Sequence, residues 1–313
     1  MNCSIVLVAY YSDNWLPVCI DSLIESGNND CHLILVDNAG NALLDKLNFT
    51  GFDVEILRTP HPMGFAEANN FALSEATYLR NYVIFLNQDT ISPGGWLRGC
   101  IKYLNRNLDF AAISPVIRNY DGTDWDPSFL SCLSTQQFLE LEGQRSEQSI
   151  ITTYIPAPAM IVRTSVLEHT GLFDPIYGSY YEDYDLCARI TATGKKVGFL
   201  PTEIIYHFSG SSTDTPKKKK KRTRQILRNR FIYDVRHNGR PRGIVLAEIF
   251  SFRMVRRLGR SILNTASSQP GSAVLGAYMD FARLIPLLIN GERDRQNFDA
   301  KMRKIGWPRT ESR

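Results

Sequence analysis

The sequence predicts an α/β fold, in which a mostly parallel sheet is flanked by helices and followed by a C-terminal basic helical extension. Continuous apolar, β-branched runs such as residues 4–10 are typical of strands buried on both faces of a parallel sheet. These runs alternate with segments of helical periodicity, which is the pattern of an α/β domain. Beyond residue 238 the chain is basic and helical in pattern. We therefore expect a domain over residues 1–238 and an extension over residues 239–313.

The first part of the chain shows its elements most clearly. Apolar runs predict strands at residues 4–10, 33–37, 54–57 and 83–86, and helical periodicity predicts helices at residues 15–26 and 64–79. Ligands of such sheets bind at the carboxyl ends of the strands. The polar residues at these ends are Tyr10, Asp37, Asn38 and Asp89.

The later part is less regular. Residues 120–150 are polar and predict a loop or lid that leads to a helix near residues 135–142. Strands are expected at residues 155–162, 197–200 and 203–207, and the lysine-rich run at residues 217–222 predicts a mobile loop. Beyond residue 223 the pattern is helical. It includes an apolar helix at residues 273–289, broken by Asp280 and Arg283 and kinked at Pro286.

The composition argues against several classes of protein. No apolar stretch of about 18 residues is present, so we expect no membrane-spanning helix. The start of the chain lacks the pattern of a signal peptide. The six cysteines are scattered without close pairs, which argues against a zinc site and a disulfide framework and favours a reducing cytoplasm.

Charge is distributed unevenly. Residues 1–216 carry 12 Lys/Arg and 25 Asp/Glu, whereas residues 217–313 carry 24 Lys/Arg and 7 Asp/Glu. The basic part favours a polyanionic surface, either nucleic acid or anionic lipid. Helical spacing places four arginines on one face of an amphipathic helix, which suits an anionic membrane: Arg253, Arg256, Arg257 and Arg260. A helix packed on the domain with a solvated basic face is the alternative, and the pattern leaves both open.

The segment 180–189 holds three carboxylates, Glu182, Asp183 and Asp185, among tyrosines and directly before an amphipathic run. A solvated acidic turn does not require aromatic neighbours, and a core helix does not tolerate these charges. A carboxylate in an aromatic, partly desolvated setting is typical of a general base.

Asp89 is a candidate metal ligand. A carboxylate at the end of a buried strand can bind Mg²⁺ or Mn²⁺ that bridges the phosphates of a nucleotide. The alternative is an aspartate that caps its own backbone at the strand end. His207 also ends an apolar strand, where a structural histidine is the commoner case, and it becomes a ligand of the same metal only if it faces Asp89.

Asp37 and the helix that opens at Gly64 are candidates for nucleotide binding. Asp37 is placed to accept from a ring N–H of a base or to hold a ribose hydroxyl, and a turn or helix cap is the alternative. The small residues from Gly64 onward allow close backbone approach, and a helix N-terminus favours phosphate. The dinucleotide fingerprint GxGxxG is absent, and a glycine that only turns the chain is the alternative.

These blocks follow one another in a familiar order. The chain resembles inverting family 2 glycosyltransferases of the GT-A fold, in particular their rhamnosyltransferase-like and galactofuranosyltransferase-like branch, from residue 4 to about residue 237. The blocks that carry the resemblance are the first strand with Tyr10, Leu35-Val36-Asp37-Asn38, Gly64-Phe65-Ala66 with Asn69-Asn70, Leu86-Asn87-Gln88-Asp89-Thr90, Gly171-Leu172-Phe173-Asp174, the segment 182–189, and His207 with Gly210 and Ser212.

The resemblance implies a role for each matched position. It implies that Asp183 is the general base and that Glu182 is a second catalytic residue. It also implies that Glu182 and Asp185 bind the acceptor and that Asp89 and His207 hold Mg²⁺ or Mn²⁺. Donor contacts are implied for Ala9, Tyr10, Asp37, Gly64, Asn69, Asn87 and Asp89. The chain departs from the family in three places: Asn87 replaces the first Asp of DxD, Glu67-Ala68 replace the two glycines of Gly-Gly-Asn-Asn, and Ala9 replaces a frequent Thr.

From this resemblance we expect a metal-dependent, inverting glycosyltransferase of surface polysaccharide biosynthesis. It would move rhamnose from dTDP-rhamnose, or a sugar from a UDP-linked donor, to a hydroxyl of a lipid-linked glycan. We expect a cytoplasmic protein that is peripheral on the inner face of the cell membrane. The alternatives are an inactive GT-A scaffold that binds nucleotide or carbohydrate, and a nucleic-acid-binding protein. We expect no nucleic-acid partner, because the lysine run lacks interleaved aromatics and no nucleic-acid motif is recognised.

Overall fold

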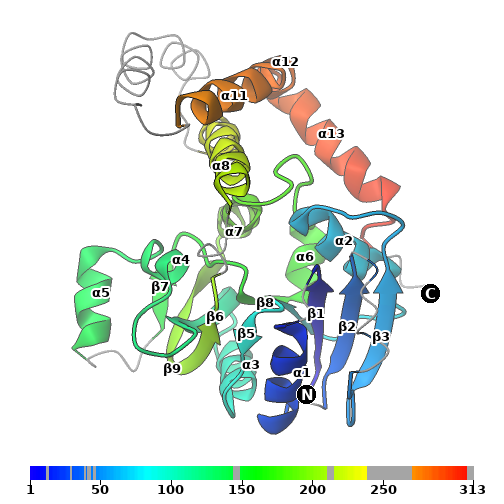
Figure 1. Cartoon of the computed structure of the whole chain (residues 1–313), viewed down its shortest axis with the longest axis vertical. Helices are drawn as coiled ribbons and strands as arrows, with labels where there is room; N and C mark the ends of the chain where they lie inside the picture. Colours follow the sequence, from blue (N-terminus) through cyan, green and yellow to red (C-terminus); the bar gives the residue numbers. More distant parts are fainter. Residues whose placement is uncertain are drawn as a thin grey trace.

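The computed structural model of this chain describes residues 1–11, 14–28, 30–38, 40, 44, 47–143, 149–209, 215–237 and 270–308. These residues form an α/β domain whose sheet is flanked by helices, and further long helices lie across one end of that domain (Figure 1). The predicted fold class is confirmed.

Nine strands of the described chain form one sheet in the order β3-β2-β1-β4-β8-β6-β9-β5, with β7 paired to β9. Their bounds are β1 Cys3–Ala9, β2 His32–Asp37, β3 Asp53–Arg58, β4 Tyr82–Leu86, β5 Thr90–Ile91, β6 Phe110–Asn119, β7 Ile150–Thr152, β8 Ala159–Arg163 and β9 Lys196–His207.

The sheet has a parallel half and a mixed half. Strands β3, β2, β1 and β4 are parallel neighbours, and all six residues of β2 are buried, as the apolar run predicts. Strand β8 runs antiparallel to both β4 and β6, whereas β6 and β9 are parallel. The parallel half therefore brings the carboxyl ends of β1, β2 and β4 to one edge of the sheet.

Two strand predictions in the later part need correction. The strand expected at residues 155–162 begins at Ala159, because Pro156 and Pro158 cannot donate ladder hydrogen bonds. The two strands expected at residues 197–200 and 203–207 are one strand, β9. A shift in the pairing of β9 with β6 between Leu200 and Ile204 accommodates the proline at position 201. Strand β6 was not among the predicted elements.

The helices of the domain are α1 Leu16–Glu25, α2 Phe65–Glu75, α3 Trp96–Arg106, α4 Pro127–Leu130, α5 Thr135–Glu142, α6 Thr164–Thr170 and α7 Glu182–Ala192. The predicted apolar positions of α1 are fully or almost fully buried in the core: Leu16, Cys19, Ile20 and Leu23. The helix expected near residues 135–142 is present as α5.

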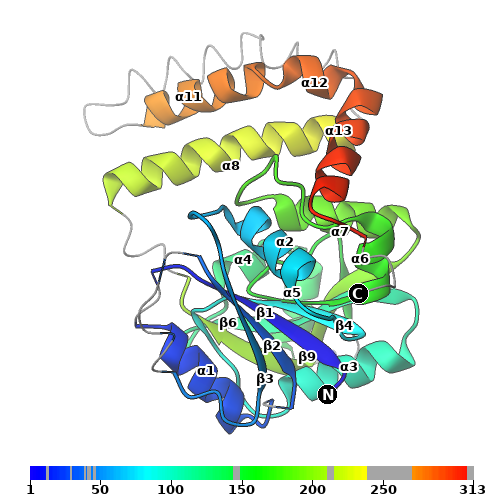
Figure 2. The same ribbon diagram turned by 90° about the vertical axis from the view of Figure 1, so that its right-hand side faces the viewer.

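The long helices are α8 Pro216–His237, α11 Pro270–Ala282, α12 Ile285–Ile289 and α13 Gly291–Lys304. In Figure 2, α8 lies between the sheet domain and α11–α12, which run along it. The prediction of a loop at residues 217–222 is wrong, because lysine is a good helix former and Pro216 suits the first helical position. The helix expected at residues 273–289 is two helices, α11 and α12, which are separated at Arg283 as predicted. The break expected at Asp280 is wrong, because Asp280 lies inside α11, and Pro286 lies in the first turn of α12. The stripe of arginines at residues 253–260 lies outside the described residues.

The end of the described chain returns to the sheet domain. Trp307 is 2% exposed and donates from Nε1 to the carbonyl oxygen of Leu167 at 3.1 Å, and Met302 joins the main hydrophobic core. Arg236 of α8 forms ion pairs with both Asp174, at 2.8 Å, and Asp294 of α13. The described part of the extension, residues 270–308, is therefore packed on the domain. Across all described residues, none of the helices combines the length and apolarity that crossing a membrane requires.

Candidate active site

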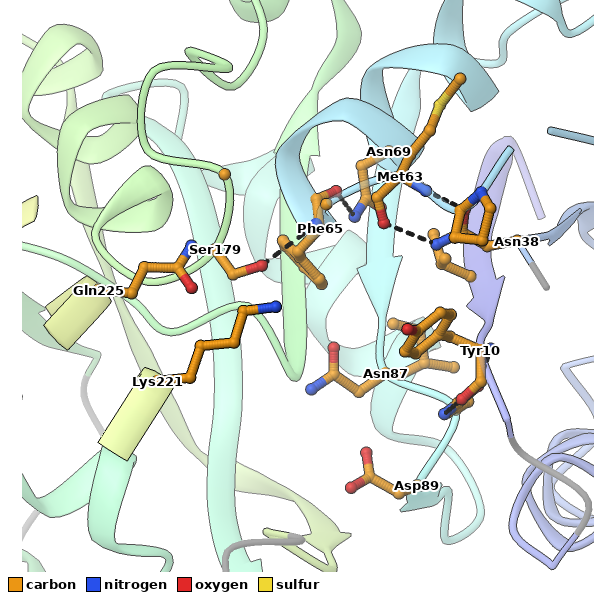
Figure 3. Close-up of a pocket in the computed structure, with 16 residues that line it drawn as sticks. Tyr10, Asn38, Met63, Phe65, Asn69, Asn87, Asp89, Ser179, Lys221 and Gln225 are labelled. Carbon is orange, nitrogen blue, oxygen red and sulfur yellow. Dashed lines mark hydrogen bonds between the residues drawn. The ribbon is translucent and has the colours of Figure 1, made fainter. Parts of the chain in front are cut away.

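A cavity of about 570 Å³ opens at the carboxyl ends of β1, β2 and β4 (Figure 3). Five of the predicted donor-binding residues line it: Tyr10, Gly64, Asn69, Asn87 and Asp89. It is also lined by residues for which no role was predicted, among them Gln88, Gly178, Ser179, Lys221 and Gln225. The fold thus brings together residues from the start of the chain and from α8.

The other two predicted donor residues lie behind the lining. Ala9 is fully buried in β1, and its carbonyl oxygen accepts from the N–H of Asn38 at 2.9 Å. Asp37 is 4% exposed and lies 3.7 Å from Nε of Arg58. Its neighbour Asn38 lines the cavity instead.

Two amide side chains fix the strand ends around the cavity. Asn38 donates from Nδ2 to the carbonyl oxygen of Met63 at 2.9 Å, and its Oδ1 accepts from the N–H of Met63 at 2.8 Å. Gln88 forms the same kind of reciprocal pair with the backbone of Tyr10, at 2.7 and 2.9 Å. Each amide therefore joins two backbone segments through a pair of hydrogen bonds and holds the cavity lining in place.

The N-terminus of α2 is hydrogen-bonded to residues 178 and 179 of the protein itself. The N–H of Ala66 donates to the carbonyl oxygen of Gly178 at 2.9 Å, and the N–H of Phe65 donates to Oγ of Ser179 at 3.3 Å. A Cβ on Gly64 would lie 3.1 Å from the Gly178 oxygen. The close backbone approach predicted at Gly64 is thus made to the 178–179 loop, which leaves fewer N–H groups for a phosphate.

The predicted metal ligands face one another. Asp89 follows β4 and His207 ends β9, and their Oδ1 and Nε2 atoms are 3.3 Å apart. The side-chain nitrogen of Asn87 lies 3.4 Å from the same Nε2. Two ligands of one Mg²⁺, each at about 2.1 Å and at a right angle, are about 3 Å apart. The condition set for His207, that it face Asp89, is therefore met.

This pair does not form a closed metal site. The described residues contain no group of three or more His, Cys, Asp or Glu side chains arranged to hold a metal ion. A cation held by Asp89 and His207 would complete its coordination with ligand phosphates and water, which is the usual arrangement for Mg²⁺ in nucleotide sites. The residues present fit such a cation.

A buried carboxylate orients His207. Asp126, the residue before α4, is fully buried, and its Oδ2 accepts from Nδ1 of His207 at 2.9 Å and from Oγ of Ser209. Its Oδ1 accepts from the N–H groups of Ser128 and Phe129. The hydrogen bond between Nδ1 of His207 and Asp126 fixes the imidazole so that Nε2 points at Asp89. The role of Asp126 was missed, because the sequence shows only a helix cap and not a contact across 81 residues.

The charges of this group depend on one another. Burial raises the pKa of Asp126, but hydrogen bonds from His207, Ser128 and Ser209 outweigh it and hold the pKa well below its usual range. Burial lowers the pKa of His207, but hydrogen bonds to Asp126 and Asp89 outweigh it and raise the pKa to about 9. Without a metal, the imidazole is therefore a cation between two carboxylates.

The acidic motif lies at the start of α7, behind an unusual turn. Tyr180 and Tyr181 both have positive φ, at 69° and 73°, and α7 begins at Glu182. Neither Glu182 nor Asp183 lines the cavity, although Gly178 and Ser179 just ahead of them do. Non-glycine residues with such φ angles each cost on the order of 1–3 kcal/mol, so the surrounding structure must hold this turn.

The two adjacent carboxyl groups differ in charge. Burial, and next the charge of Asp183, raise the pKa of Glu182 well above its usual range. Glu182 is 5% exposed, and its Oε2 has no hydrogen-bond partner among the described residues. Burial raises the pKa of Asp183 to about 6, opposed by the N–H of Tyr184 at 2.9 Å. The pKa of about 6 leaves Asp183 mainly ionised at neutral pH, whereas burial favours the protonated form of Glu182.

Asp185 is occupied by structural partners. It is 2% exposed, and it pairs with Nε of Arg189 at 2.9 Å and with Nε2 of His237 at 2.8 Å. Burial raises its pKa, but Arg189, His237 and Arg236 outweigh this effect and hold the pKa well below its usual range. These contacts join α7 to α8, and a contact with acceptor would compete with them.

Known proteins are similar to this chain in sequence and in fold. Residues 4–170 match the family model described as Glycosyl transferase family 2. The pre-mycofactocin glycosyltransferase of Mycobacterium tuberculosis is 26% identical over 178 residues, which are 56% of this chain and 37% of that protein. This chain thus spans less than half the length of that relative. The rhamnosyltransferase WbbL of Escherichia coli is 21% identical over 228 residues, which are 66% of this chain and 83% of that protein.

Two solved structures share the fold. One is the mannosyltransferase PcManGT from Pyrobaculum calidifontis in complex with GDP-Man and Mn²⁺, with a TM-score of 0.54 and 16% identity over 97% of this chain and 86% of that one. The other is S. aureus TarS 1–349 in complex with UDP-GlcNAc, with a TM-score of 0.55 and 15% identity over 99% and 93% of the two chains. At these identities the likeness concerns the fold alone.

Proposed function

Because the chain belongs to glycosyl transferase family 2, we propose that it transfers a sugar from a nucleoside diphosphate donor to an acceptor hydroxyl, with inversion at the anomeric carbon. The observation that carries this proposal is the cavity at the carboxyl ends of the parallel strands, with Asp89 and His207 3.3 Å apart at one side. An inactive scaffold would not need the buried Asp126 that orients His207, so we favour the enzyme.

The donor base is proposed to bind near the ends of β1 and β2. Tyr10 and Asn38 line this side of the cavity, and Asp37 lies directly before Asn38 at the end of β2. We propose dTDP-rhamnose as the first donor to test, with UDP-linked sugars next. The similarity to WbbL, which extends over 83% of that protein, supports the first, and the complex of TarS with UDP-GlcNAc supports the second.

In the proposed reaction, Asp183 takes the proton of the acceptor hydroxyl. The acceptor oxygen attacks the anomeric carbon from the face opposite the diphosphate, the bond to the diphosphate breaks, and the anomeric centre inverts. A positioned base contributes about 10²–10⁴ in rate. The pKa of Asp183, about 6, leaves it ionised at neutral pH and basic enough to accept the proton as the bond forms.

Asp89 and His207 are proposed to hold Mg²⁺ or Mn²⁺ at the diphosphate. Such a cation, when bound, supplies neutralisation of the charge on the leaving diphosphate. Asn87 contributes an uncharged amide to this side of the cavity, so the protein contributes one carboxylate there instead of two. The donor phosphates would then supply much of the negative charge around the cation.

The acceptor is proposed to be a lipid-linked glycan, reached by peripheral association with the inner face of the membrane. The basic part of the chain supports this proposal, because each Lys or Arg near an anionic surface adds about 1 kcal/mol of attraction. The exposed Lys217, Lys218 and Lys219 of α8 belong to this part.

The proposed function is tested by a thermal-shift series with UDP, dTDP, GDP and their sugars, with and without Mn²⁺. A ligand that binds only the folded chain raises its melting temperature. We expect a Mn²⁺-dependent rise with one of these nucleotides that Asp89→Ala abolishes. Asp183→Asn should keep the rise and lose sugar transfer. A folded wild-type protein that responds to none of these nucleotides would refute the proposal.

A further inference from the structure

We infer that Lys221 of α8 binds the diphosphate of the donor, so that an element beyond residues 4–170 completes the donor site. This inference rests on the proposed function. Lys221 lines the same cavity as Asn69, Asn87 and Asp89. Figure 3 shows its amino group pointing into the cavity from α8, on the side away from Tyr10 and Asn38.

The charges of the cavity lining favour a diphosphate between Asp89 and α8. Among the described residues that line the cavity, Asp89 is the single carboxylate and Lys221 the single lysine or arginine. A divalent cation held by Asp89 and His207 would supply positive charge on that side of the cavity, and Lys221 supplies positive charge on the α8 side. A lysine ammonium is a compact charge with three donors, which suits phosphate oxygens. Within the part of the chain that the structure describes, no carboxylate forms an ion pair with Lys221.

The backbone that carries Lys221 is held against the cavity. Gln225, one turn further along α8, also lines the cavity and donates from Nε2 to the carbonyl oxygen of Tyr177 at 3.2 Å. Asn229, one turn beyond that, is fully buried, and its Nδ2 lies 2.8 Å, 2.9 Å and 2.6 Å from the carbonyl oxygens of Tyr177, Ser179 and Tyr180. These bonds tie α8 to the 177–180 loop, which itself contributes Gly178 and Ser179 to the lining. Lys221 therefore approaches the cavity from a fixed helix.

The positive charge of the lysine run at the start of α8 favours binding of an anion there. Lysines 217–221 occupy the first turns of α8. Cations at a helix N-terminus are disfavoured by the helix dipole, and like charges three or four residues apart repel. A bound diphosphate relieves part of this cost at Lys221, so donor binding should also stabilise the first turns of α8. Residues two positions apart in a helix point about 160° away from each other, so Lys219 is a matched control on the opposite face.

The test measures dissociation constants for UDP, dTDP and GDP with Mn²⁺ by calorimetry. It uses the whole chain as wild type, Lys221→Met, Lys221→Arg and Lys219→Met. We expect Lys221→Met to lower the affinity for the nucleotide that the wild type binds by about tenfold. Lys221→Arg and Lys219→Met should remain close to the wild type. Hydrogen exchange at residues 216–224 should slow on nucleotide binding in the wild type and in Lys219→Met, and should not slow in Lys221→Met.

Other results would contradict either the role of Lys221 or the proposed function. Lys221→Met that binds nucleotide as the wild type does overturns the inference and leaves the proposed function standing. The same holds if Lys221→Met and Lys219→Met weaken binding equally, because that result indicates unspecific attraction by the lysine run. A wild type that binds no nucleoside diphosphate overturns the proposed function, and the inference with it.

Discussion

Asp183 and Glu182 are neighbours along the chain with different surroundings. Glu182 is buried, its Oε2 has no hydrogen-bond partner among the described residues, and burial raises its pKa well above the usual range, which favours the protonated form. Asp183 is partly exposed and accepts a backbone hydrogen bond, and its pKa is about 6. Two carboxyl groups whose environments separate their pKa values are typical of a site that moves protons.

The pKa of Asp183 predicts a pH profile. Because the base must be ionised, kcat/KM should fall as pH is lowered through about 6. Initial rates measured from about pH 5 to pH 8 would show this limb, and Asp183→Asn should lack it together with most of the turnover.

The same shift predicts the stability of that variant. The pKa of Asp183 in the folded chain lies above its ordinary value of 3.8, so ionisation destabilises the fold as pH rises from about 4 through 6. Asp183→Asn should therefore be at least as stable as the wild type at pH 7.5 and lose this advantage near pH 4. A variant that is inactive and less stable at pH 7.5 would contradict the assignment of Asp183 as a base whose pKa is raised by burial.

Asp126 predicts a residue-level effect on metal binding. Asp126→Asn keeps the shape of the side chain but removes the carboxylate that orients His207. We expect affinity for Mn²⁺, measured with nucleotide by calorimetry, to fall about 10–100-fold. Asp124→Asn changes an exposed aspartate two residues away and should have no effect. Equal Mn²⁺ affinity in both variants would show that His207 needs no such support.

At the scale of elements, α8 links the two ends of the site. Its first turns place Lys221 at the cavity, and its last turn places His237 and Arg236 on Asp185 and Asp174. Between them, Asn229 holds the carbonyls of the 177–180 loop just ahead of Asp183. One helix therefore positions both the cavity wall and the start of α7.

This arrangement predicts the effect of changing Asn229. Asn229→Ala leaves carbonyl groups of the loop without a donor, which costs about 1–3 kcal/mol for each buried unsatisfied group. We expect a lower melting temperature and a fall in kcat, because the positive-φ turn at Tyr180 and Tyr181 loses its support. Arg230→Ala, at a side chain that is 64% exposed on the same helix, is the control. An Asn229→Ala variant with normal kcat would show that catalysis does not depend on the support that Asn229 gives to this turn.

At the scale of the whole molecule, the uneven charge predicts membrane attraction. We expect the full chain to float with vesicles that contain anionic lipid at low salt, and not with neutral vesicles. Replacing Lys217, Lys218 and Lys219 with Gln should reduce the floating fraction, because it removes three exposed charges and leaves the cavity intact. If the wild type stays in the soluble fraction at low salt, the peripheral association is refuted.

The parallel half of the sheet and the residues at its carboxyl edge could be predicted from the sequence. The strands and helices there follow local patterns, namely fully apolar runs and the 3.6-residue period, and the structure reproduces them in order. The pairing of Asp89 with His207 was conditional on geometry, and the fold meets that condition. The antiparallel direction of β8 could not be predicted from its residues, because the direction of a strand depends on how the preceding chain crosses the sheet.

The remaining contacts of the site depend on segments that are far apart in the sequence. The contact between Asp126 and His207 spans 81 residues, and no local pattern specifies it. The lysine run at residues 217–222 was predicted as a loop because of its charge, yet it forms the first turns of α8. This helix is held in place by Arg224, which binds α11, by Asn229, which binds the 177–180 loop, and by Arg236, which binds α13. Asp185 shares a motif with Asp183 but faces Arg189 and His237. Sequence patterns fix which face of an element is buried, whereas the partners of a polar side chain depend on segments that meet only in the folded chain.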